Sequence, residues 1–176
     1  MGLFKRIKVI CDKFQQNKAF ELIKNKILED KDLVIFFVPG KFKSGGGIMS
    51  IFNLVKTSRY FNKNVIIVTV PSSYTYIKNN NFKNEETIFR FKQIINIIDR
   101  IERLIIHIPE YMISKFYDSL SSSDIKKFKS IKDFQINILN QNINLMPGVN
   151  EVEKLCNLTN NISQTTAHHK YCNQEM

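Results

Sequence analysis

The chain has 176 residues, of which 43% are hydrophobic and 24% are charged, so it is long and apolar enough for one domain with a buried core. No apolar stretch reaches the length of a membrane-spanning helix and no secretory leader is visible, so we expect a cytoplasmic protein. The formal net charge of +10 comes from lysines scattered through a sequence rich in Lys, Asn and Ile, without a basic stripe interleaved with aromatics. We therefore expect no nucleic-acid partner, and anionic lipid is a simpler use of the charge.

The pattern of apolar and basic residues in 1–31 predicts an amphipathic helix, which precedes a domain at 32–176. The apolar side of this helix consists of Leu3, Ile7, Ile10 and Phe14. Lysine and arginine crowd the other side, a composition typical of helices that lie on a membrane surface. Two interpretations remain open. The helix either docks at the inner face of the membrane, or packs on the domain with its basic side in solvent.

The domain is organised around a β-loop-α-β unit at residues 32–70. The run DLVIFFV is continuously apolar and rich in Val, Ile and Phe, as in a strand buried on both faces of a parallel sheet. Apolar residues at 48–55 then recur at helical spacing, and 65–70 predicts a second buried strand. A right-handed crossover of this kind leaves the connecting loop at the carboxyl edge of the first strand, where open α/β sheets bind ligands.

The connecting loop at 39–47 is rich in glycine, and its candidate substrate-binding residues are Ser44, Gly45, Gly46 and Gly47. Glycine lets the backbone approach a ligand, and the start of the following helix attracts anions. A flexible turn without a ligand is the alternative. The loop has neither the P-loop order nor G-x-G-x-x-G, and Pro71 stands near where a dinucleotide fold places an acidic residue. We expect no cofactor.

Extended and helical patterns alternate over the rest of the chain. Extended segments are expected at 88–91, 104–108, 134–146 with an interruption at 140–142, and 162–165; helices are expected at 94–101, 111–120, 125–131 and from Asn150 onward, with Val152, Leu155 and Cys156 facing inward. A serine-rich break at 121–124 should cap the helix that follows it. This pattern predicts an α/β, Rossmann-like domain with a mainly parallel open sheet of about five strands and helices on both faces.

Two further candidate residues, His107 and Glu110, flank Pro109 at the end of an apolar strand. Polar groups at such a carboxyl edge can meet a ligand, whereas the alternative for His107 is a partly buried histidine satisfied by the backbone. The three cysteines are widely spaced and form no C-x-x-C pair, which favours a reducing compartment and argues against structural zinc. We expect no metal site.

Four segments, taken in order, resemble a known family: SGGGIMSIFNLVKTSRYFNKNVIIVTV, IIHIPEYM, INLMPGVNEVEKL and ISQTTAHHKY. Over residues 32–172 they resemble the N-terminal half of a GT-B glycosyltransferase of bacterial surface-polysaccharide synthesis. In that family the glycine-rich loop and a strand followed by Thr-Ala-His or similar residues line the cleft between two Rossmann-like domains. The resemblance implies substrate contacts at 44–47, His107, Glu110, Thr166 and His168, and it names no catalytic residue.

Such transferases have a second Rossmann-like domain for the nucleotide-sugar diphosphate, and the sequence stops before one. The resemblance therefore implies the acceptor-side half of a hexosyl-type transferase, from a truncated gene or a split enzyme, that is inactive or very weak alone. Its partners would be a nucleotide-sugar donor, a glycan or lipid-linked acceptor and a separate donor-domain subunit. The alternative class is a non-catalytic Rossmann-like binding or membrane-docking subunit, which leaves enzymatic activity an open question.

Overall fold

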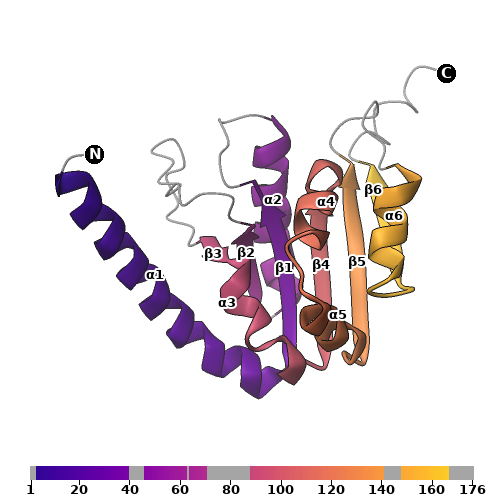
Figure 1. The fold of residues 1–176 in the computed structure, drawn as a ribbon, viewed down its shortest axis with the longest axis horizontal. Coiled ribbons are helices and arrows are strands. Elements are labelled where there is room, and N and C mark those ends of the chain that lie inside the picture. Colours follow the sequence, from indigo (N-terminus) through magenta and orange to yellow (C-terminus); the bar gives the residue numbers. More distant parts are fainter. Residues whose placement is uncertain (1–2, 40–45, 63, 71–87, 141–147, 167–176) are drawn as a thin grey trace.

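The structure is a computed structural model that describes residues 3–39, 46–62, 64–70, 88–140 and 148–166, without the side chains of 3–16, 46, 165 and 166. These ranges form a six-stranded parallel sheet with helices on both faces (Figure 1). The predicted α/β, Rossmann-like architecture is confirmed, with six strands where about five were expected.

The strands are β1 (Asp32–Val38), β2 (Val65–Thr69), β3 (Ile88–Arg90), β4 (Arg103–Pro109), β5 (Asp133–Asn140) and β6 (Ile162–Thr166). The helices are α1 (Leu3–Asp30), α2 (Gly46–Phe61), α3 (Phe91–Ile95), α4 (Ile113–Tyr117), α5 (Ser122–Lys129) and α6 (Val149–Cys156), with 3-10 helices η1 (Ile98–Arg100) and η2 (Glu110–Met112).

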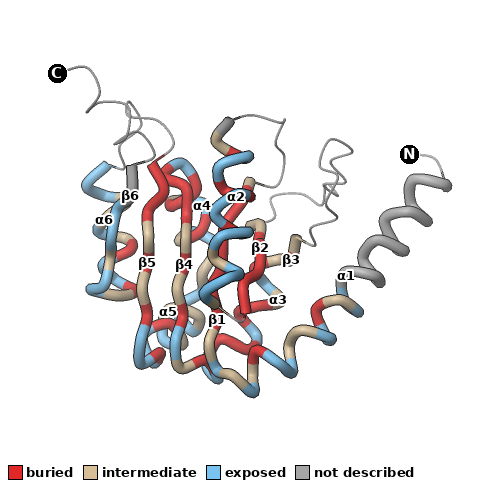
Figure 2. Tube along the Cα trace, turned by 180° about the vertical axis from the view of Figure 1, so that it is seen from behind, coloured by how far each residue is buried: buried red, intermediate tan, exposed pale blue. Residues whose placement is uncertain are grey.

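The strand order is β3-β2-β1-β4-β5-β6. From β1 the chain adds β2 and β3 toward one edge of the sheet, and from β4 it adds β5 and β6 toward the other edge. Right-handed crossovers then place the connecting helices of the two halves on opposite faces. Helix α2 covers one face of β1 and β2, which we call the α2 face, while α1, α3, α4, α5 and α6 lie on the other (Figures 1 and 2). The order reverses between β1 and β4, and this is the point at which such sheets bind ligands.

Strand β1 is central because its side chains enter two separate cores. On the α2 face, Val34, Phe36 and Val38 pack against α2 residues such as Ile51 and Val55. On the other face, Leu33, Ile35 and Phe37 join the larger core. That core contains a group of five aromatic rings, one from each of β1, α3, α4, α5 and β5: Phe37, Phe91, Phe116, Phe128 and Phe134.

Strands β4 and β5 are more deeply buried on one face than on the α2 face, where Leu139 alone of the β5 residues belongs to the core. In β4, Leu104, Ile106 and Ile108 are buried, whereas the alternate residues Ile105 and His107 are half-buried. In β5 the half-buried positions are polar, and no helix in the described ranges covers the α2 face of this half of the sheet (Figure 2). This unequal burial explains why polar residues occur between the apolar residues of β4 and β5, whereas β1 is apolar from Leu33 to Val38.

Several helix boundaries differ from the sequence prediction. The helix expected at 94–101 is divided into α3 and η1, and the one expected at 111–120 begins as η2. The expected cap is present: Ser121 Oγ accepts a hydrogen bond from the Asp124 amide (3.2 Å), so α5 begins earlier than 125. Helix α6 is capped by Gly148 rather than Asn150. Cys156, expected to face inward, is exposed, because α6 packs on the core through Leu155 one position earlier.

Helix α1 confirms the expected N-terminal helix and belongs partly to the core. Phe20 and Ile27 are buried on the face opposite α2, while the helix axis leads away from the sheet toward the N-terminus (Figure 1). The side chains of the predicted amphipathic face, residues 3–14, lie outside the described part. Within the described ranges no helix combines the length and apolarity needed to cross a bilayer.

Candidate functional site

All six strands run parallel, so their carboxyl ends meet at one edge of the sheet (Figure 1). Besides β6, which ends in Thr166, four of these strands end in, or are followed by, a polar residue: Arg90, Thr69, Glu110 and Asn140. Register puts Arg90 beside Thr69, and Glu110 and Asn140 follow the paired residues Pro109 and Leu139. With Tyr111 and the helix start at Gly46 and Gly47, these residues form what we call the carboxyl-edge site.

Glu110 and Asn140 are the most enclosed polar groups of this site. Glu110 begins η2 and is 5% exposed, and Asn140 ends β5 and is 2% exposed. Burying a carboxylate and an amide costs free energy unless they are hydrogen-bonded, and buried groups of this kind at the ligand-binding edge of a sheet are candidates for function. Burial and the Glu110 charge raise the pKa of the neighbouring Tyr111 to about 12, so its hydroxyl remains a hydrogen-bond donor at neutral pH.

Thr69 carries the clearest unsatisfied group. Its Oγ1 is buried and makes no hydrogen bond in the described structure. A hydroxyl left without a partner costs about 1–3 kcal/mol. A ligand oxygen at the end of β2 would remove this cost, so the position of the hydroxyl suits a polar ligand.

The site is long enough for a sugar-sized or larger ligand. Neighbouring strands lie about 4.8 Å apart, so the four steps from β3 to β5 span roughly 19 Å. The edge offers a carboxylate, an amide, two hydroxyls, a guanidinium and the first backbone N–H groups of α2. Such a mixture suits a ligand with many hydroxyl groups and an attached anion.

The predicted site residues are distributed unequally over this edge. Gly46 and Gly47 form the first turn of α2, and Glu110 lies at the end of β4. Thr166 ends β6 opposite Asn140, although its side chain is not described. Ser44, Gly45 and His168 lie outside the described residues. No described glycine has a positive φ.

His107 lies inside β4 on the α2 face, below the edge that holds Glu110. Its ring stacks on Phe36 with centroids 4.2 Å apart and planes inclined by 5°. Its Nδ1 lies 3.4 Å from Asn137 Nδ2, so a side chain satisfies it rather than the backbone. Burial lowers its pKa to about 4, so the imidazole is neutral at pH 7 and offers no positive charge to a phosphate.

The lowered pKa of His107 predicts that the stability of the fold depends on pH. Because its pKa is about 4 folded and 6.5 unfolded, the unfolded chain binds the extra proton between these values. The contribution of His107 to the free energy of unfolding is therefore fully present above pH ~6.5 and falls by about 3 kcal/mol as the pH drops to ~4. Below pH ~4 both states are protonated, and no further stability is lost through this group. In urea titrations across this range we expect His107→Gln to flatten the slope. Parallel slopes for the two proteins would contradict the assignment.

Sequence analysis missed Thr69, Arg90, Tyr111 and Asn140. The available signal was a polar residue directly after an apolar run, as in VIIVT and INILN. It also missed the hydrogen-bonded group around His107 on the α2 face. Gln135 Nε2 donates to Asn137 Oδ1 (2.7 Å), and Ser163 donates to the same oxygen.

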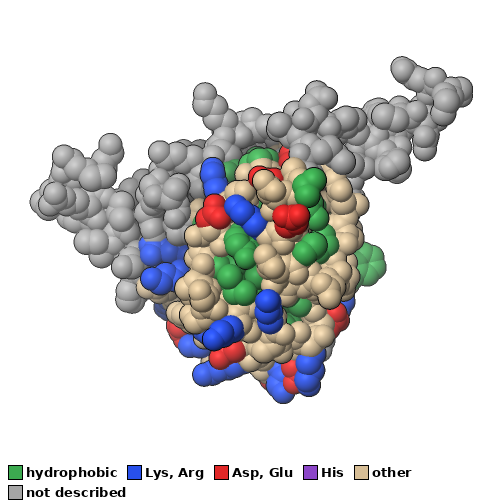
Figure 3. All heavy atoms as spheres, turned by 45° about the vertical axis from the view of Figure 1, so that its right-hand side comes forward, with side chains coloured by type: hydrophobic (Ala, Val, Ile, Leu, Met, Phe, Trp, Pro, Cys, Tyr) green, Lys and Arg blue, Asp and Glu red, His purple; other side chains and the backbone are tan. Residues whose placement is uncertain are grey.

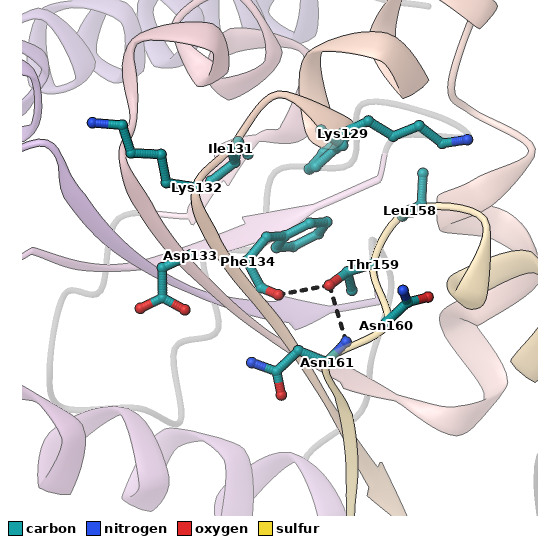
Figure 4. A pocket seen from close by; sticks show the side chains of 10 residues that line it. Lys129, Ile131, Lys132, Asp133, Phe134, Leu158, Thr159, Asn160 and Asn161 are labelled. Atoms are coloured by element: carbon teal, nitrogen blue, oxygen red, sulfur yellow. Dashed lines mark hydrogen bonds between the residues drawn. The ribbon is translucent and has the colours of Figure 1, made fainter.

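A hollow of about 290 Å³ lies at the opposite edge of the sheet, near the start of β5 and the turn before β6 (Figure 4). Lys129 and Lys132 on its rim extend in different directions, and Thr159 bridges the two segments by donating to the Phe134 carbonyl (2.7 Å) and accepting from the Asn161 amide (3.1 Å). Its polar groups therefore hold the fold and do not converge on a ligand.

Charges are mixed on the side of the molecule that carries α6 and β6. Lys and Arg side chains there alternate with Asp and Glu (Figure 3). One of the ion pairs joins Lys154 of α6 to Asp118 at the end of α4 (3.1 Å). No group of three or more metal-ligating side chains occurs among the described residues.

No protein-family model and no curated protein matches this chain. The strand order and the crossovers define a Rossmann-like domain. Since one fold serves many functions, a function must be argued from the site itself.

Proposed function

We propose that this chain is the acceptor-side half of a GT-B type glycosyltransferase, which transfers a sugar from a nucleotide sugar in cell-surface polysaccharide synthesis. The main support is the burial of Glu110 at the carboxyl edge, next to the point where the strand order reverses. The four sequence segments that resemble this family support it independently.

Glu110 is suited to act as the general base. Transfer requires a group that takes the proton of the acceptor hydroxyl as this oxygen attacks the sugar. A carboxylate in a site that excludes water can do this, and the neighbouring Asn140 amide and Tyr111 hydroxyl can hold other hydroxyls of the acceptor. At the far end of the edge, Arg90 and Thr69 suit an anionic part of the ligand, such as the phosphate of a lipid-linked acceptor.

The donor would be held by a second domain, which we propose to lie outside residues 1–176. The described residues form a single Rossmann-like unit, and stabilising the departing diphosphate requires cationic or N–H groups placed around it. Losing even one such contact typically slows a reaction by about 100- to 1,000-fold. We therefore expect purified 1–176 to show little or no transfer from any nucleotide sugar. Robust transfer by this chain alone would contradict the proposal that a second domain binds the donor.

Thr69→Val provides a direct test of ligand binding. The change removes the unsatisfied hydroxyl but keeps the shape, so we expect the free protein to gain up to about 1 kcal/mol of stability. Affinity for a phosphate-bearing oligosaccharide acceptor, measured by calorimetry, should fall by about five- to tenfold. A loss of stability with unchanged affinity would show that the hydroxyl serves only the fold.

A further inference from the structure

Helix α2 carries an unusual number of exposed hydrophobic side chains for a surface helix. Seven large hydrophobic side chains are exposed in the described structure, and four of them belong to α2: Met49 (42%), Leu54 (44%), Tyr60 (87%) and Phe61 (82%). Isolated exposed hydrophobic residues are normal on proteins, but a concentration on one helix indicates an interaction surface.

These four residues lie along the two flanks of the exposed side of the helix. Buried residues at 48, 51, 52 and 55 define the inner side, which packs on the sheet. At 100° per residue, Met49 and Tyr60 form one row on the exposed side, and Leu54 and Phe61 form a second row. The exposed polar residues Ser50, Asn53 and Thr57 lie between the two rows, and the exposed Lys56 lies one turn before Tyr60, at the edge of the first row. We call Met49, Leu54, Lys56, Tyr60 and Phe61 the outer face of α2.

The charge of α2 has one sign. The helix contains no acidic residue, and its charged side chains are Lys56 and Arg59. Helices α1, α5 and α6 combine both signs, as α1 does with its Lys24–Glu21 pair (3.0 Å), whereas the short helices α3 and α4 each carry one lysine and no acidic residue. A surface that unites aromatic rings with positive charge and excludes negative charge is complementary to anionic lipid headgroups.

We propose that the outer face of α2 lies on an anionic phospholipid bilayer. Tyr60 and Phe61 enter the headgroup region with their rings, and Lys56 remains near the lipid phosphates. With 16 residues the helix is about 24 Å long, enough to lie along the surface. This contact is separate from the docking expected of residues 1–31.

The position of α2 connects this surface to the carboxyl-edge site. Its first turn, Gly46 and Gly47, belongs to that site, so a bilayer along the helix would bring the site beside lipid headgroups. A lipid-linked acceptor would then be presented where it reacts. This last step rests on the proposed function, whereas membrane binding by α2 does not.

The test is sedimentation of the full chain with vesicles of phosphatidylcholine mixed with phosphatidylglycerol, compared with phosphatidylcholine alone. We expect binding to the anionic vesicles, a partition constant at least about tenfold lower for the double variant Tyr60→Ser, Phe61→Ser, and about fivefold lower for Lys56→Gln. The matched control is Leu22→Ser, which changes an equally exposed residue (74%) of α1 and should leave binding unchanged.

A spectroscopic measurement locates the contact directly. The chain contains no tryptophan, so Phe61→Trp and Leu22→Trp each introduce a single reporter. Anionic vesicles should shift the emission of the first to shorter wavelength and leave the second unchanged.

Three results would overturn the proposal: no binding of the wild type to anionic vesicles, equal binding of the double variant, or an equal effect at Leu22. Self-association that disappears in the double variant, without vesicle binding, would instead assign the face to a contact between copies. Deleting residues 1–31 is unsuitable as a control, since it removes Phe20 and Ile27 from the core. None of these results depends on sugar transfer, so failure here and failure of the proposed function are distinguishable.

Discussion

Replacing Glu110 by glutamine is expected to reduce sugar transfer by about 100- to 10,000-fold when the chain is combined with a donor-binding subunit. Glutamine has nearly the same shape and can occupy the buried position, but it cannot take the proton of an acceptor hydroxyl. The loss should appear in kcat, because an amide can still form hydrogen bonds to the bound acceptor. Acceptor affinity should change much less.

The matched control is Glu153→Gln, which alters an exposed carboxylate of α6 away from the site. It should leave both transfer and thermal midpoint unchanged. If Glu110→Gln retains full transfer with an intact fold, the base lies elsewhere. If acceptor binds but no donor-binding subunit supports transfer even in the wild type, the chain belongs to the non-catalytic alternative.

Phe116→Ala is expected to lower the free energy of unfolding by about 3–5 kcal/mol. The ring is fully buried in α4 and contacts three other rings, Phe37, Phe91 and Phe128, at centroid distances of 5.1, 5.3 and 6.0 Å. These partners come from a strand and two helices, so truncation opens a cavity where several elements meet. The loss is a large fraction of the 5–15 kcal/mol that is typical of a domain.

Urea denaturation would measure this loss, with Phe61→Ala as the control, because the Phe61 ring is 82% exposed. The control should change stability by less than about 0.5 kcal/mol. Phe116→Leu, which keeps much of the volume, should lie between the two. Similar stabilities for Phe116→Ala and Phe61→Ala would show that the aromatic group is not the centre of the core.

Sequence alone determined the elements whose burial leaves a regular hydrophobic pattern. The run from Asp32 to Val38 could be identified because a strand covered on both faces needs apolar residues at every position. Helix α2 could be identified because only its inner side is covered, which leaves a helical period in the sequence. The parallel α/β class followed from the alternation of such segments.

Tertiary structure decided everything that depends on which strands are neighbours. Hydrophobic pattern carries no information on strand order, so the reversal between β1 and β4, and with it the location of the site, could not be read from spacing. Thr69 and Asn140 become site residues only because parallel strands bring their ends to one edge. His107 and Glu110, three residues apart, are separated because alternate strand residues face opposite sides and the chain turns at Pro109. The short-range rules fix each element, whereas long-range packing decides which polar side chains meet.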